Sequence, residues 1–387
     1  MVRFNIKVPV VFGLLCGPAS ADDTCPSEAV WASNWVDKKP ETAQEKQTEI
    51  TALEEYAFTL QGEDAKRLGV RTNGMLIIQK GQILYEKYAR GFASDNPHLM
   101  WSISKSALAA ITGRAVFEGY ISLEDSICNY YSEIPATHCE ITVLDLLRFS
   151  SGLQWKEMYE EESNQQSSVL AMFYGVGSMD MAKFAANHPR RDPPGTSFSY
   201  SSGDANILSA VIGNAVTNTE GENFPWTLLF DPLGMKDAVF ERDAAGTYIG
   251  SAFLYLTLHD AAKLGAFYLY DGCWENTRLL PQGWVTESTK IQGPIVENFL
   301  CCGENSVGGW SWWINKDLPS ANLTAMFPDL PEDTFFSMGH WGQLIVVIPS
   351  WEMIIVRTGD DRDQTTDSNK LMHLAMQVGT RPTRESQ

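Results

Sequence analysis

The segment Trp101-Ser102-Ile103-Ser104-Lys105-Ser106 opens an alanine-rich run, and the pattern predicts a helix over 105–117. Positions three apart lie on one face of a helix, so Ser102 and Lys105 bring a hydroxyl and an amine together near its N-terminus. A serine becomes a nucleophile when an adjacent base takes its proton, and a lysine of lowered pKa is such a base. A serine N-cap followed by a solvated lysine has the same spacing, so further motifs must decide.

Strand-like segments lie on both sides of this helical middle. The runs 74–78 and 83–88 predict one β-hairpin, and the runs 344–348 and 353–356 predict a second. Further helices are predicted at 47–60, 143–147, 206–215 and 260–269, the last with Asp260 capping it in a T-x-x-D box with Thr257. The sequence therefore predicts an α+β fold, with an antiparallel sheet built from both ends of the chain, flanking helices and a mostly helical insert.

The same pattern divides the chain into parts. We expect a signal peptide at 1–21, a polar and irregular N-terminal arm at 22–46, a sheet domain formed by 47–100 and 245–387, and a mostly helical domain at 101–244.

The N-terminus has the three parts of a secretory signal peptide. Arg3 and Lys7 precede an apolar stretch over 8–15, and Ala19-Ser20-Ala21 supplies the cleavage site. The apolar stretch is too short to span a bilayer, so we expect no stable membrane anchor. Cleavage near Ala21 predicts a periplasmic or secreted protein.

Export affects the interpretation of the cysteines. Six lie beyond the signal, at positions 25, 128, 139, 273, 301 and 302, and an even set in an oxidising compartment predicts disulfides. Cys128 and Cys139 flank a turn and are expected to form a local bridge. Adjacent Cys301 and Cys302 are expected to bond elsewhere, with Cys273 and Cys25 as candidate partners. Metal-binding cysteine and histidine spacings are absent from the sequence, so we expect no metal and no cofactor.

The charge of the chain bears on its partners. With 29 Lys and Arg against 48 Asp and Glu, the 387 residues carry a formal net charge of −19, which argues against a nucleic-acid partner. A small molecule is the expected partner, and the sequence carries no signal for an oligomeric state.

Two further motifs follow Ser102 and Lys105 in order. A turn-rich loop over 193–202 presents Tyr200 before a helical run, and Gly339-His340-Trp341-Gly342-Gln343 leads into a strong strand. With these motifs the chain resembles the serine β-lactamase-like hydrolases, which comprise class C β-lactamases, D-alanyl-D-alanine carboxypeptidases and family VIII esterases. Their motifs are S-x-x-K, Y-x-N or Y-x-S, and K-T-G or H-x-G.

The resemblance extends over most of the chain after residue 21. Supporting segments similar to those of the family lie at 141–153, 231–235 and 308–313. The Tyr-x-Ser motif, the Gly-His-x-Gly-Gln strand and the segment 279–284 are most similar to the 6-aminohexanoate-dimer hydrolase branch.

The resemblance implies roles for the reacting groups. Ser102 would be the acylated nucleophile, Lys105 its general base, and Tyr200 the group that relays the proton to the leaving group. The backbone N–H groups of Ser102 and Gln343 would form the oxyanion hole.

The resemblance also implies the substrate-binding residues. Ser202, His340, Trp341, Gly342 and Trp313 would border the substrate, with Gly342 allowing its close approach to the strand. Ser202 and His340-Trp341 depart from the Asn and the Lys-Thr pair of β-lactamases. The departures favour carboxylic esters or linear amides as the substrate.

Two other functions stay open. One is a β-lactamase or D,D-carboxypeptidase. The other is a non-catalytic, penicillin-binding-like ligand sensor, whose mark would be the loss of the Ser, Lys or Tyr, all three of which are present here.

Overall fold

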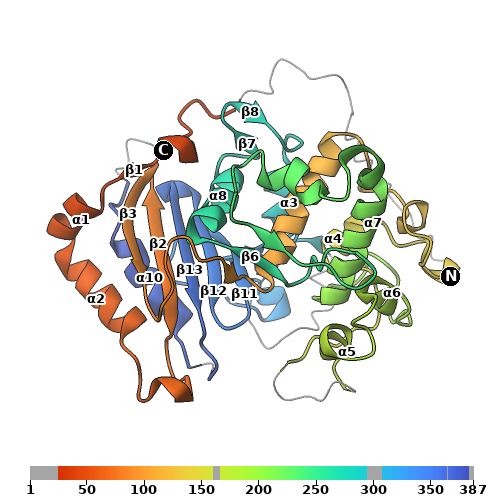
Figure 1. Cartoon of the computed structure of the whole chain (residues 1–387), viewed down its shortest axis with the longest axis horizontal. Coiled ribbons are helices and arrows are strands. Elements are labelled where there is room, and N and C mark those ends of the chain that lie inside the picture. The colour runs from red at the N-terminus through yellow and green to blue at the C-terminus, as the bar shows by residue number, and fades with distance from the viewer. Residues whose placement is uncertain (1–24, 160–165, 294–306, 364, 383–387) are drawn as a thin grey trace, which may run out of the picture.

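The computed structural model describes residues 25–159, 166–293, 307–363 and 365–382, and its main element is an eight-stranded sheet (Figure 1). In sheet order, its described strands are β1 (Val36–Asp37), β3 (Gln82–Tyr88), β2 (Thr72–Gln79), β13 (Met353–Gly359), β12 (Gln343–Ile348), β11 (Phe335–Gly339), β10 (Trp313–Ile314) and β9 (Val307–Gly308). The two predicted hairpins, β2–β3 and β12–β13, are confirmed, and they join where β13 pairs with β2. The sheet is therefore built from both ends of the chain, as the α+β prediction requires.

Helices cover both faces of this sheet and form a separate layer beside it (Figure 1). The described α-helices are α1 (Lys39–Glu45), α2 (Gln47–Phe58), α3 (Ile103–Phe117), α4 (Val143–Leu147), α5 (Ser168–Tyr174), α6 (Met181–Ala186), α7 (Ser202–Glu220), α8 (Leu258–Leu269), α9 (Trp284–Ser288) and α10 (Ser368–Gln377). Short strands β4 (His98–Leu99), β6 (Leu254–Leu256) and β5 (Val239–Phe240) form a small sheet, and β7 (Cys273–Trp274) pairs with β8 (Thr277–Arg278). Helices α2 and α10 contact one another on one side of the large sheet, and α8 packs against β2, β12 and β13.

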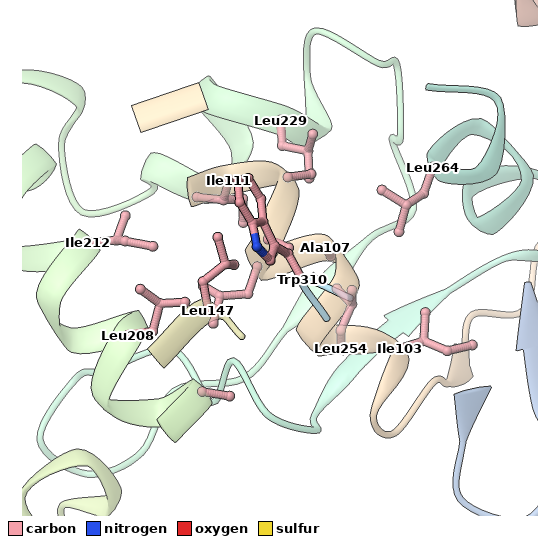
Figure 2. Packing of buried hydrophobic residues seen from close by; sticks show 14 of the residues in the cluster. Ile103, Ala107, Ile111, Leu147, Leu208, Ile212, Leu229, Leu254, Leu264 and Trp310 are labelled. Carbon is pink, nitrogen blue, oxygen red and sulfur yellow. The ribbon is translucent and has the colours of Figure 1, made fainter. Parts of the chain in front are cut away.

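Helix α3 lies at the centre of the larger core. It is buried on almost every side, which explains its run of alanines, since large residues would keep its neighbours away. Figure 2 shows Ile103, Ala107 and Ile111 packed among side chains from the helical layer, the small sheet and α8. This packing fixes the N-terminal end of α3, where Ser102 lies.

Local caps explain where the structure differs from the predicted helix bounds. Helix α7 begins four residues earlier than predicted because Ser201 caps it by accepting the Asp204 N–H at 2.9 Å. Helix α8 begins at Leu258 because Thr257 accepts the Asp260 N–H at 3.1 Å. Thr257 is therefore the cap, and Asp260 instead binds the Lys263 ammonium.

The N-terminal segment corrects two expectations, that of an irregular arm and that of a wholly antiparallel sheet. The signal peptide predicted at 1–21 lies outside the described residues. From Cys25 onward the arm is not irregular, because it contains α1 and the strand β1, which pairs with β3. That pairing is parallel, so the sheet is mixed rather than wholly antiparallel.

Two disulfides tie the described chain together. Cys128 bonds to Cys139, as predicted, and Cys25 bonds to Cys273. The bond between Cys25 and Cys273 corrects the expectation that these two cysteines form disulfides with Cys301 and Cys302. Cys301 and Cys302 lie outside the described residues. Disulfide bonds are typical of an oxidising compartment. None of the helices within the described ranges has the length and hydrophobicity needed to cross a membrane.

The two disulfides should differ in their contributions to stability. Cys25 and Cys273 are 248 residues apart and Cys128 and Cys139 only 11 apart, so the first removes more entropy from the unfolded chain. We expect C25S/C273S to lower the free energy of unfolding by about 5 kcal/mol and C128S/C139S by about 3 kcal/mol. Urea unfolding of both variants checks this, and an equal or reversed order would contradict it.

Candidate active site

The structure brings Ser102 and Lys105 together at the start of α3. Ser102 is the residue before the first turn, and the Lys105 Nζ lies 3.1 Å from its Oγ. Trp101, directly before the serine, has a left-handed backbone with φ of 49°, a costly conformation for a bulky residue. The chain therefore turns sharply at Trp101 and presents Ser102 at the end of a buried helix.

The amine of Lys105 is enclosed by protein. Its side chain is only 2% exposed, and its Nζ donates to the Ser202 Oγ at 3.0 Å and to the Ser251 carbonyl at 2.8 Å. Burial lowers the pKa of Lys105 to about 8, against the opposing attraction of the Glu157 carboxylate. A substantial fraction of the side chain is therefore neutral near pH 8 and able to accept a proton.

A buried carboxylate lies behind this amine. Glu157 accepts hydrogen bonds from both the N–H and the hydroxyl of Ser202, at 2.9 and 2.5 Å. Its oxygens also accept from the Trp155 indole at 2.5 Å and the Tyr159 hydroxyl at 2.7 Å. Burial and this carboxylate hold the pKa of Tyr159 well above its usual range, so its hydroxyl stays a donor. Glu157 thus connects the loop after α4 to the start of α7.

A narrow cavity opens beside Ser102. Its described lining is Ser102, Lys105, Phe149, Phe198, Tyr200, Gly308, Gly309, Ser311, Trp312, Trp313, Ser337 and Met338. The Tyr200 ring packs on the Trp313 ring, with centroids 5.3 Å apart. The Lys105 Nζ lies 4.8 Å from the centre of the Tyr200 ring. The structure therefore gathers Ser102, Lys105, Tyr200 and Trp313 at one cavity, and five of its twelve described lining residues are aromatic.

Two of the predicted site residues are fully buried away from the cavity. Ser202 is fully buried between Lys105 and Glu157, so it stands behind the base and does not border the cavity. Gln343 is also fully buried, at the start of β12, where its amide bonds the His340 and Gly359 carbonyls at 2.9 Å each. Neither belongs to the cavity lining.

Strand β10 begins at Trp313, so the part of β11 after Phe336 has no β10 residue paired with it. The two strands pair as far as Trp313 and Phe336, and the Ser311 carbonyl accepts instead from the Ser106 hydroxyl at 2.6 Å. The Thr334 carbonyl accepts the N–H of Asn315, the residue directly after β10, and alternate residues of an antiparallel strand face the same neighbour. The Met338 amide therefore faces this unpaired side of β11, beside the cavity that Ser102 also lines.

His340 and Trp341 belong to an aromatic cluster at the turn between β11 and β12. His340 stacks on Tyr159 with centroids 4.7 Å apart, and Trp101 meets Trp341 edge-on at 5.2 Å. The Arg362 guanidinium lies 3.5 Å above the Trp341 ring. The cluster holds the strained Trp101 in place, and neither His340 nor Trp341 is among the residues that line the cavity.

The structure gives a reason for glycine at position 342 other than the predicted approach of a substrate. Its φ is 89°, and an added Cβ would lie 2.1 Å from the Arg357 Nη1 and 2.7 Å from the Asp361 Oδ2. Those two groups form a buried ion pair at 2.8 Å, and the arginine also donates to the Gly342 carbonyl. The glycine therefore makes room for an ion pair of the protein, and its predicted contact with a substrate stays a prediction.

Known proteins place this site in a family. A family model described as Beta-lactamase matches residues 57–358. The chain belongs to the beta-lactamase family. A 6-aminohexanoate-dimer hydrolase from Paenarthrobacter ureafaciens is 25% identical over 221 residues, which are 55% of this chain and 56% of that protein. The chain thus matches little more than half the length of that relative.

Solved structures of other proteins share the fold. A putative 6-aminohexanoate-dimer hydrolase from Bacillus anthracis superposes with a TM-score of 0.66 at 20% identity, covering 81% of each chain. A class C beta-lactamase superposes with a TM-score of 0.58 at 15% identity, covering 89% of this chain and 98% of that one. The predicted resemblance to this family and the predicted fold are confirmed.

Sequence reasoning about this family member missed Glu157, Tyr159, Ser251 and Met338. One signal was available for the first two, because Trp155, Glu157 and Tyr159 alternate and so point to one side of an extended segment. The Ser251 carbonyl and the Met338 amide are backbone groups, which residue identity does not reveal.

Replacing Gly342 tests the structural role of the turn in this beta-lactamase family member. We expect G342A to lower the free energy of unfolding by about 2 to 4 kcal/mol. The new methyl group would displace the Arg357–Asp361 pair, and the alanine would have to adopt a positive φ that strains its backbone. Gly246→Ala is the matched control, since it also has a positive φ but meets no atom within 4 Å. Chemical denaturation of both variants checks this, and equal losses would contradict the steric account.

Proposed function

We propose that the chain is a serine hydrolase that forms an acyl-enzyme on Ser102 and cleaves carboxylic esters or linear amides. The contact that carries the proposal is the 3.1 Å distance between the Ser102 Oγ and a buried lysine amine of lowered pKa. The names of two relatives, both 6-aminohexanoate-dimer hydrolases, support a linear amide as the substrate class. The two disulfides support an exported protein, and we propose cleavage near Ala21.

The chemistry begins with one proton transfer. Neutral Lys105 takes the proton of Ser102 as the serine oxygen attacks the substrate carbonyl. The serine O–H bond and the carbonyl π bond break, N–H and O–C bonds form, and the π electron pair moves to the carbonyl oxygen as an oxyanion. As the oxyanion collapses and the scissile C–O or C–N bond breaks, Tyr200, next to Lys105 at the cavity, gives its proton to the leaving alcohol or amine and takes the proton of the Lys105 ammonium in return. Water then releases the acid from Ser102 by the same steps in reverse order.

The oxyanion formed in this attack needs two donors. The N–H of Ser102 at the start of α3 is one, and we propose the Met338 amide as the second in place of Gln343, because Met338 lines the cavity and Gln343 does not. A donor of this kind lowers the barrier by about 3 to 4 kcal/mol.

The aromatic lining favours apolar acyl groups. Phe149, Phe198 and Trp313 give the cavity side chains without charge. Lys105, the one cationic residue in the described lining, is occupied by Ser102, Ser202 and Ser251 and is not left for a substrate carboxylate.

Mass spectrometry tests the acyl-enzyme directly. We expect a fluorophosphonate to add to the folded protein at Ser102, and S102A to lose this adduct together with at least about 1,000-fold in kcat/KM for a short-chain nitrophenyl ester. Ser126→Ala is the control, because the Ser126 hydroxyl donates to the Cys139 carbonyl and the residue is not part of the cavity lining. An S102A variant that keeps full activity would contradict the proposal, and binding of esters, amides and β-lactams without turnover would favour a sensor instead.

The pH dependence follows from the pKa of Lys105. The amine must be neutral to accept a proton, so kcat/KM should rise with pH, about tenfold per unit below a midpoint near 8, and level off above it. Lys105→Arg should abolish the activity, whereas Lys87→Arg on the distant strand β3 should not. A profile that falls between pH 6 and 9 would contradict Lys105 as the base.

A further inference from the structure

The three contacts of Lys105 limit how its amine can be oriented. A neutral amine has two N–H bonds and one lone pair, in a tetrahedral arrangement. Its partners are the Ser251 carbonyl at 2.8 Å, the Ser202 Oγ at 3.0 Å and the Ser102 Oγ at 3.1 Å. A carbonyl can only accept, so one N–H must point to Ser251. The orientation of the other two groups depends on the two hydroxyls.

Glu157 decides the orientation of the Ser202 hydroxyl. An ionised carboxylate only accepts, and it lies 2.5 Å from the Ser202 Oγ while also accepting the Ser202 N–H at 2.9 Å. The Ser202 hydroxyl therefore donates to Glu157 and leaves a lone pair for Lys105. The second N–H of Lys105 then points to Ser202, and the lone pair of the amine is left for Ser102.

We propose that Glu157 is a positioning residue that, through the Ser202 hydroxyl, directs the lone pair of Lys105 at Ser102. The inference rests on the proposed acyl-enzyme at Ser102. In the proton transfer the Ser102 O–H bond breaks and a third N–H bond forms on Lys105, while Glu157 keeps no proton and Ser202 does not change partners. The carboxylate also stabilises the ammonium that forms, because the two charges interact through the buried hydroxyl.

The position of Glu157 is itself fixed. The Trp155 indole N–H holds one carboxylate oxygen at 2.5 Å, and the Tyr159 hydroxyl holds the other at 2.7 Å. Each oxygen therefore meets two donors, one of them from Ser202. A glutamine at position 157 would have an NH₂ group in place of one carboxylate oxygen, so this NH₂ would face two groups that are themselves donors. If that NH₂ faced the Ser202 hydroxyl, Ser202 would accept from it and donate to the Lys105 lone pair.

The groups around Lys105 allow a pH readout. Its titratable neighbours in the described chain are Glu157, across Ser202, and Tyr200, with Tyr159 beyond the carboxylate and His340 stacked on Tyr159. Removing the charge of Glu157 removes an attraction that favours the ammonium. The acid limb of the rate profile should then move to lower pH, an effect that a purely structural role would not produce.

A double-mutant cycle tests the proposal with the full-length protein and a short-chain nitrophenyl ester. We expect E157Q to lower kcat/KM by about 10- to 100-fold and to move its acid limb below that of the wild type. In the S202A background, where the connecting hydroxyl is gone, E157Q should cost less than about threefold. Glu54→Gln, whose carboxylate binds Tyr85 and Lys87 away from the site, is the control for losing one negative charge.

The outcomes separate this inference from the proposed function. A wild type without an adduct at Ser102 overturns both. A wild type that forms the adduct, with E157Q unchanged or equally harmful in both backgrounds, overturns only the role of Glu157. If E157Q does not fold, S202N replaces it, because its amide can donate to Glu157 and accept from Lys105. The proposal then expects S202N to exceed S202A in kcat/KM by at least about tenfold, and an S202N no better than S202A contradicts it.

Discussion

The buried amine of Lys105 is the constraint on which the rest of the site depends. Burying an amine away from water costs free energy unless each of its hydrogen bonds is made within the protein. The Lys105 amine makes three such hydrogen bonds. Its partners come from the turn before α3, the start of α7 and the loop before β6. Because these segments are far apart in sequence, the amine is satisfied only when the helical layer and the small sheet meet correctly around α3.

The packing around α3 also positions residues of the site that do not contact Lys105. Ser106, on the first turns of α3, binds the Ser311 carbonyl and the Ser337 hydroxyl, so the helix is anchored at the edge of β11. Ser337 belongs to β11, and Met338 beside it lines the cavity next to Ser102. The aromatic cluster around Trp101 holds the other side of the serine. Rigid surroundings of this kind fix a reacting group without further reorganisation.

The sequence predicted the features that depend on local pattern. Alternation and turns located β2, β3, β12 and β13, and the spacing of Ser102 and Lys105 located the pair that the structure places 3.1 Å apart. It did not predict that Met338 lines the cavity, since that depends on where the pairing of β10 with β11 stops. Nor did it give Glu157 its place behind Ser202, because hydrogen bonds 45 residues apart leave no periodic signal.

A direct titration of Lys105 tests the central claim, that this amine is neutral when the serine reacts. The protein can be labelled with lysine carrying ¹³C and ¹⁵N at the side-chain end, and the Lys105 signal assigned by its loss in K105R. Followed by NMR from pH 6 to 11, the signal should titrate near 8, well below the usual 10.5 for lysine. A midpoint at or above 10 would show a charged amine and contradict the account.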